Sequence, residues 1–409
     1  MVNQEVIDQH AEEAAFLWTQ REHATCAPQY ALKDLAKLDE RVEAHLDGLR
    51  VAGNTGWETA VAQLEQGRGE VFAAAVLAFE SGDSTHTSAV LEVGCSAAPL
   101  ASSLVSALGW LQQHVVVPQA RTLLNSQQPE IRRTGIAGMA VHRLDPGSLL
   151  SVAIADRNCR LAARAMKAAA ELGRRDLLPD ILERLSDGDG LCRFWAAWSA
   201  VRLGERRSTR AIAILRAVAE APGPLAMRAL DIALRTMPIE DAGMWRRHLA
   251  GRISTSRLAV FAAGVIGDHT AVPELIAAME NPKLARASGG AFSMITGVDL
   301  SYEHLDGDAP PGDGEGDDSS SGDSDFPWPV PAAVAIWWTK RAPAYVPGLR
   351  YLCGKAMTVP SLREVLVAGR QDQRASAAME VALRHPSEIL FETRERAQWQ
   401  QKKVRSWSS

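Results

Sequence analysis

The 409-residue chain lacks the cysteine spacing of a disulfide framework or a zinc cluster. Its five cysteines are odd in number, and none belongs to a CxxC pair: Cys26, Cys95, Cys159, Cys192 and Cys353. Disulfide frameworks and common zinc sites show even or closely paired cysteines. We therefore expect free thiols and no metal, which suits the reducing cytoplasm.

The chain has no apolar run of about 18 residues, the length that a membrane-spanning helix needs. Its first 18 residues are acidic and lack the basic start and apolar core of a signal peptide. These two absences predict a cytoplasmic protein without a membrane segment.

Familiar catalytic motifs are also missing. The ten histidines are scattered, and the sequence contains no HExxH, GxSxG, Walker or GxGxxG pattern. An acidic stretch at 303–325 carries carboxylates that suit calcium, but it lacks the EF-hand spacing. We expect no enzyme activity, catalytic residue, cofactor or metal, although these absences exclude only the familiar families.

Helix formers and small apolar residues are abundant instead. Hydrophobic residues make up 46% of the chain, and Ala, Leu, Arg and Glu dominate. A single core stops growing beyond about 250–300 residues, whereas a repeat array escapes that limit because each unit packs only on its neighbours. This composition and length favour a helical repeat protein.

A period of about 31 residues supports that interpretation. Apolar helical segments end in glycine at Gly173, Gly204, Gly267 and Gly297, and the same step backwards reaches a break at His142 and then Gly109. Glycine after a helix end adopts the left-handed turn without a Cβ penalty. The pattern predicts an all-α HEAT-like solenoid: a right-handed stack of six or more antiparallel helix pairs.

The composition divides the chain into five parts. We predict a helical N-terminal cap over 1–75, HEAT-like repeats over 76–302, a disordered acidic linker over 303–325, a helical segment rich in Trp and Pro over 326–392, and a flexible tail over 393–409. The linker has no Lys or Arg and almost no apolar residue, so it cannot repay its ordering entropy.

Positive charge gathers in the middle of the chain. Residues 130–290 carry 24 basic and 17 acidic side chains, although the whole chain has a net charge of −5. An arginine recurs near the start of one helix in each repeat: Arg132, Arg160, Arg193, Arg228, Arg257 and Arg286. These arginines either bind neighbouring turns and acids such as Asp156 and Asp189, or form a ridge that binds an acidic protein or a phosphate backbone.

Tryptophans offer a second candidate surface. Trp337 and Trp338 lie among prolines in the C-terminal segment. They either hold that segment against the last repeats or form a partner-binding hot spot, where Trp is enriched. Candidate partner-binding residues are therefore Arg160, Arg193, Arg228, Arg257, Trp337 and Trp338.

The C-terminal third resembles a known group of proteins. The order AFSMITGVDLSYEHL (291–305), an acidic spacer, PWPVP, IWW (336–338), PGLRYLCGKAMT (347–358) and RQDQRASAAMEVAL (370–383) is similar to an uncharacterised bacterial family of HEAT-repeat-like proteins encoded beside type VI secretion genes. The likeness is strongest over 290–392, and that family offers no assigned catalytic residues. It implies a cytoplasmic accessory protein of a contractile secretion system.

These observations predict a protein-binding scaffold that serves as adaptor or chaperone for a secretion effector, spike or adaptor protein. An immunity protein that covers a toxin is an alternative of the same class. A HEAT-fold lyase or DNA glycosylase is an alternative of another class, against which the acidic net charge argues. Nucleic acid and membrane are not expected partners, and the sequence leaves the oligomeric state open.

Overall fold

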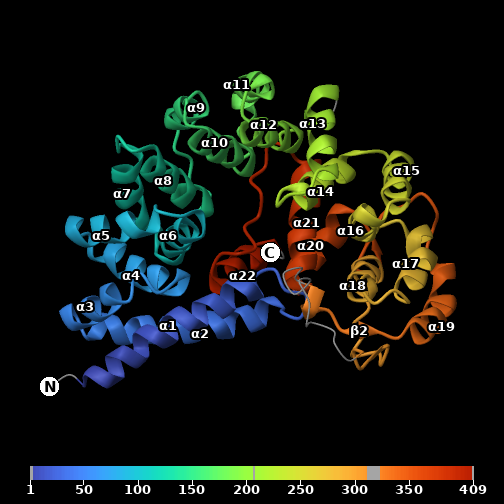
Figure 1. Cartoon of the computed structure of the whole chain (residues 1–409), viewed down its shortest axis with the longest axis horizontal. Helices are drawn as coiled ribbons and strands as arrows, with labels where there is room; N and C mark the ends of the chain where they lie inside the picture. The colour runs from blue at the N-terminus through green and yellow to red at the C-terminus, as the bar shows by residue number, and fades with distance from the viewer. Residues whose placement is uncertain (1–2, 206–207, 311–322, 408–409) are drawn as a thin grey trace. The chain divides into compact units, whose positions relative to one another are not determined.

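The computed structural model describes residues 3–205, 208–310 and 323–407, and most of these are helical, with almost no sheet. They confirm the predicted all-helical, solenoid-like fold (Figure 1). The chain forms two compact units. Unit 1 comprises Met1–Cys26, Tyr30–Leu203 and His385–Ser409, and unit 2 comprises Ala27–Gln29 and Gly204–Arg384. Among the described residues, no helix is both long and apolar enough to cross a bilayer.

Unit 1 starts with a long helix pair and continues as helical hairpins. Its elements are α1 (Gln4–Ala24), α2 (Leu32–Val51), α3 (Asn54–Ala62), α4 (Arg68–Ser81), α5 (Ser84–Gly94), α6 (Ala98–Trp110), α7 (Gln113–Leu124), α8 (Pro129–Val141), α9 (Ser148–Ile154), α10 (Cys159–Glu171), α11 (Leu178–Glu183), α12 (Gly190–Arg202) and α22 (Ala397–Arg405). Helices α1, α4, α6, α8, α10 and α12 pack one on the next and form a continuous row. The helices α5, α7, α9 and α11 pack against members of that row, and α5 contacts both α4 and α6.

Unit 2 repeats the same plan. It contains α13 (Thr209–Glu220), α14 (Ala226–Thr236), α15 (Ile239–Ala250), α16 (Ser256–Ile266), α17 (Val272–Ala278), α18 (Ala285–Thr296), α19 (Pro331–Arg341), α20 (Val359–Ala368) and α21 (Gln371–Arg384). Here α14, α16 and α18 form the row, and α13, α15 and α17 cover it. Two short antiparallel ribbons pair β1 (Asp306–Gly307) with β2 (Trp328–Pro329), and β3 (Tyr351–Leu352) with β4 (Lys355–Ala356).

The predicted helix ends are mostly confirmed. Gly173, Gly204, Gly267 and Gly297 all have positive φ angles after helices of the two rows. At the break predicted near His142, the left-handed residue is its neighbour Arg143, with φ of 57°. The expectation for Gly109 is wrong, because that residue lies inside α6, which continues to Trp110.

These glycines also make room for the C-terminal part of the chain. In unit 2 the backbone N–H of Tyr351 donates to the carbonyl of Gly267 at 2.8 Å, and a Cβ on Gly267 would lie 2.2 Å from the Tyr351 oxygen. In unit 1 a Cβ on Gly173 would lie 2.5 Å from the Ser387 oxygen. The chain therefore runs directly across helix ends that carry no side chain.

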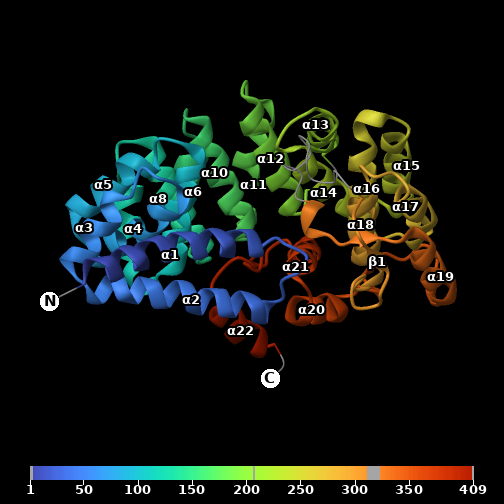
Figure 2. The same cartoon turned by 60° about the horizontal axis from the view of Figure 1, so that its bottom comes forward.

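The predicted flexible tail is wrong for its described part. Residues Ala397–Arg405 form α22, which packs against α2 and buries Ala397, Gln400 and Val404 (Figure 2). The charged sequence of this segment did not indicate a packed helix, because the surface that covers α22 comes from the start of the chain.

Other predicted boundaries also shift. The limit of the N-terminal cap at residue 75 falls inside α4, which belongs to the row of repeats. Both ends of the predicted acidic linker are ordered, as β1 and as a short 3-10 helix at Asp323–Asp325. Residues 311–322 of that linker lie outside the described residues.

Candidate functional site

A pocket in unit 2 lies between the covering helices of two successive hairpins. It has a volume of about 400 Å³ and is lined by Ile212, Arg216, Met237, Asp241, Met244, Trp245 and His248. This volume lies within the range of about 300–1,000 Å³ that is usual for ligand pockets.

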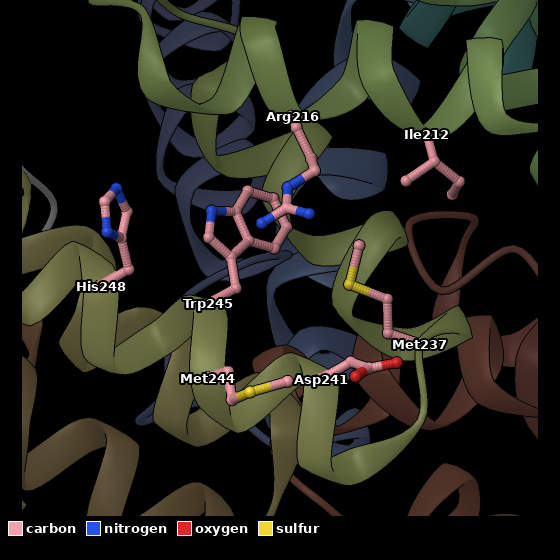
Figure 3. A pocket seen from close by; sticks show the side chains of 7 residues that line it. All are labelled: Ile212, Arg216, Met237, Asp241, Met244, Trp245 and His248. Carbon is pink, nitrogen blue, oxygen red and sulfur yellow. The ribbon is translucent and has the colours of Figure 1, made fainter.

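Helical periodicity explains why these side chains face one another. Ile212 and Arg216 are four residues apart on α13, so they share one face. On α15 the lining residues are Asp241, Met244, Trp245 and His248, which follow the spacing of three, four and seven that places side chains on one face of a helix. Figure 3 shows the side chains of Arg216 and Trp245 pointing toward one another between the two helices.

The floor of the pocket is apolar and in part exposed. Trp245 is 2% exposed and belongs to the core, whereas Met244 is 56% exposed. Met237 and Ile212 are half-buried. Methionine side chains are flexible and polarisable, so they adapt to partner surfaces of different shape.

Charged groups fix the orientation of the tryptophan and surround it. The Arg216 guanidinium lies 4.8 Å from the centre of the Trp245 ring, a cation–π arrangement. The indole N–H of Trp245 donates to Glu220 at 2.9 Å. His248 and Asp241 are exposed and add polar groups to the wall of the pocket. The pocket thus offers an apolar floor with cationic and anionic groups around it.

The predicted arginines are spread over both units and do not line this pocket. Arg160 and Arg228 are exposed near the starts of α10 and α14. Arg193 donates to the backbone carbonyls of Asp187 and Gly188 at 2.8 and 2.9 Å. Arg257 is paired with Asp323.

The alternative role for these arginines, binding to neighbouring turns, is visible in two repeats. Arg132 donates to the carbonyls of Ser126 and Gln127, which precede it by six and five residues, as Asp187 and Gly188 precede Arg193. Arg132 also pairs with Asp156 at 2.8 Å, as the sequence suggested. The recurring arginine therefore stabilises the turn before its helix in both repeats.

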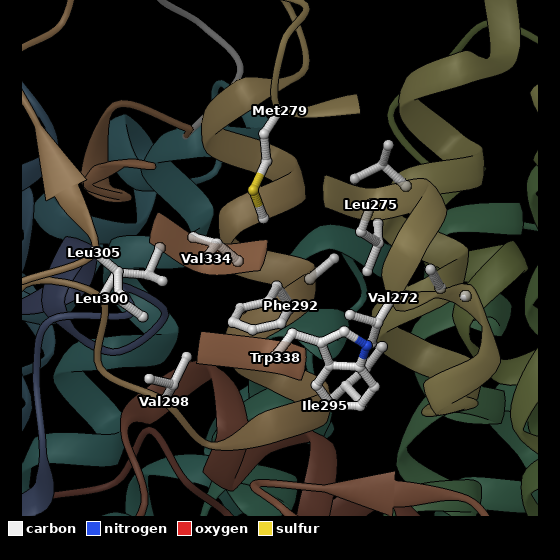
Figure 4. Packing of buried hydrophobic residues seen from close by; sticks show 14 of the residues in the cluster. Val272, Leu275, Met279, Phe292, Ile295, Val298, Leu300, Leu305, Val334 and Trp338 are labelled. Carbon is white, nitrogen blue, oxygen red and sulfur yellow. The ribbon is translucent and has the colours of Figure 1, made fainter. Parts of the chain in front are cut away.

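Trp338 belongs to the hydrophobic core of unit 2, and Trp337 packs against that core. Trp338 is only 8% exposed and packs with Phe292, Val272 and Ile295 (Figure 4). Its assignment as a partner-binding residue is therefore corrected: it anchors α19 to the last hairpin. Trp337 is half-buried, and its N–H donates to Glu303 at 3.2 Å.

The pocket residues were not predicted from the sequence. The spacing of Met244, Trp245 and His248 on one helix face was the available signal. It did not distinguish a pocket from a core, because both show the same helical period.

Comparison with models of protein families finds no match to this chain, and comparison with curated proteins finds none either.

Proposed function

We propose that this chain is a protein-binding scaffold, and that the pocket between α13 and α15 receives an apolar side chain of the partner. The observation that carries the proposal is the exposed Met244 beside the cavity of about 400 Å³. Binding pockets are usually hollows lined by apolar side chains with a few polar groups, as this one is.

The chemistry of the pocket suggests the kind of segment that fits. An apolar anchor would contact Ile212, Met237 and Met244, and an acidic group beside it would reach Arg216. The surrounding sequence, residues 130–290, has an excess of basic side chains, which favours an acidic partner. Exposed Arg160 and Arg228 stay candidate contacts elsewhere on the chain.

The resemblance of the C-terminal third to proteins encoded beside type VI secretion genes supplies a context for the proposal. In that context the partner is an effector, a spike or an adaptor protein, which this chain binds in the cytoplasm before export. An immunity protein that covers a toxin would use the same kind of surface, and the identity of the bound protein distinguishes the two roles.

The test is binding of purified neighbouring gene products to the full chain, measured by calorimetry. M244E places a charge on the pocket floor and I212E places one on the facing helix, so each should weaken binding at least tenfold. V152E is the matched control, because Val152 is 67% exposed on α9 and does not line the pocket. Equal affinities for M244E and V152E, or no binding by the unaltered chain, would refute the proposal.

A further inference from the structure

Two cysteines that are 33 residues apart in sequence meet in unit 1. Cys159 begins α10 and Cys192 lies in the first turn of α12, and these helices are neighbours in the row. Both cysteines precede an arginine, in CRLAA and CRFWA, so they occupy the same position in successive repeats. Stacking of repeats brings equivalent positions together, which a search for CxxC pairs does not detect.

A carboxylate completes this cluster. The two sulfur atoms and a carboxylate oxygen of Asp189 all lie within 4.8 Å of one another. Asp189 is held in place because its Oδ1 accepts the backbone N–H groups of Leu191 and Cys192 at 2.7 and 3.1 Å. Its second oxygen is left to bind a cation.

We propose that Cys159, Cys192 and Asp189 bind a thiophilic divalent cation, Zn²⁺, which links two successive repeats. Thiolate and carboxylate are usual zinc ligands, at about 2.3 Å for sulfur and about 2.0–2.2 Å for oxygen. Ligand atoms within 4.8 Å of one another need only small side-chain movements to reach these distances around one ion. Water fills the fourth position of a tetrahedral site.

The charges around the cluster favour a cation. Asp187 and Asp189 both lie near the thiols. These anionic groups attract a metal ion, which displaces the thiol protons on binding.

The guanidinium of Arg184 lies where it can donate a hydrogen bond to a metal-bound sulfur of Cys192. Nη2 of Arg184 lies 3.4 Å from Sγ of Cys192 and 3.0 Å from a carboxylate oxygen of Asp187. Hydrogen bonds from such surrounding groups orient metal ligands and adjust the charge of the site. Arg184 therefore supports a thiolate ligand at Cys192, and Asp187 keeps this arginine in place.

The test uses the full chain, freed of metal under reducing conditions and titrated with Zn²⁺. Native mass spectrometry should show one ion per chain. Co²⁺ should give a thiolate-to-metal charge-transfer absorption, which a site made of histidines alone does not produce. C159S and C192S should each lower the zinc affinity at least tenfold and reduce that absorption by about half or more, because one of the two thiolates is lost. D189N should weaken the affinity.

C26S is the matched control, because Cys26 is exposed in the same unit. It should keep the affinity of the unaltered chain. If C192S loses helicity because Cys192 is buried, C159S at a half-buried position carries the test. Absence of zinc binding, or an unchanged affinity in C159S, would overturn the proposal.

Discussion

The carboxylate of Asp39 on α2 accepts the backbone N–H of Ala397 at 2.5 Å, although the two residues are 358 positions apart in sequence. Ala397 is the first residue of α22, so Asp39 acts as the N-terminal cap of a helix from the other end of the chain. The other oxygen of the same carboxylate accepts a hydrogen bond from Nε of the buried Arg21, at 2.8 Å. One buried side chain thus joins α1, α2 and α22.

Replacement of Asp39 by Ala should therefore destabilise unit 1 and release its C-terminal helix. Removing one partner of a buried ion pair costs about 3–5 kcal/mol. We expect a loss of about 3 kcal/mol in the free energy of unfolding by urea and faster proteolysis after residue 393. The control E12Q changes an exposed carboxylate on α1 and should leave both measurements unchanged. An equally resistant tail in D39A would contradict the capping role.

Gly267 should not tolerate a side chain. Its φ is 70°, and a Cβ would lie 2.2 Å from the carbonyl oxygen of Tyr351. The left-handed conformation alone costs an alanine about 1–2 kcal/mol, and the clash forces the hairpin of β3 and β4 away from α16. We expect G267A to lose clearly more stability than this, measured by chemical denaturation.

Gly82 is the matched control for that substitution. It follows α4 in the same left-handed conformation, with φ of 70°, and the nearest atom to a Cβ would be Nε2 of Gln119 at 3.7 Å, an ordinary contact. G82A should show only the conformational cost. Equal losses in both variants would show that the contact between Gly267 and Tyr351 contributes nothing.

Trp338 should be among the side chains that contribute most to the stability of unit 2. Truncation of a buried Phe or Trp to Ala costs about 3–5 kcal/mol, because it removes apolar burial and leaves a cavity. W338A should fall in that range. I336A on the same helix should change stability by less than about 0.5 kcal/mol, since Ile336 is 61% exposed. Thermal unfolding followed by circular dichroism compares the two.

Asp372 should lower the free energy of unfolding as pH rises, which is opposite to the usual effect of an Asp side chain. Burial raises the pKa of this carboxyl from 3.8 to about 6, and its Oδ1 has no hydrogen-bond partner within the described structure. Between these two values the folded chain holds the proton more tightly than the unfolded chain. The contribution of Asp372 therefore becomes less favourable as pH rises from about 4 to 6 and stays so above pH 6.

The variant D372N removes this titration. At pH 4 we expect its stability to equal that of the unaltered chain, and at pH 7.5 we expect it to be more stable by up to about 3 kcal/mol. Urea denaturation at the two pH values measures the difference. A gain of the same size at both pH values would indicate a packing effect instead.

Much of the architecture was predictable because it depends on local, periodic features. The glycines at 173, 204, 267 and 297 and the helical period around them led to the correct fold class. The pairing of Arg132 with Asp156 was also predictable, because one repeat brings its start close to the next.

The candidate site was less predictable. Met244 and His248 line a pocket only because α13 and α15 stand far enough apart, a spacing that depends on the packing of both hairpins. From the sequence Trp338 was compatible with a partner surface as well as with the favoured packing role, and its neighbours Phe292 and Val272 place it in the core.

The sequence by itself determined most helices of the two rows, several of their ends and their succession, because each depends on residues within about one repeat. The tertiary structure decided where distant parts meet: Ala397 on Asp39, and Tyr351 on Gly267. These contacts join surfaces from distant parts of the chain. No short-range pattern in the sequence shows that the two surfaces fit each other, so the contacts form only once the rows of helices have packed.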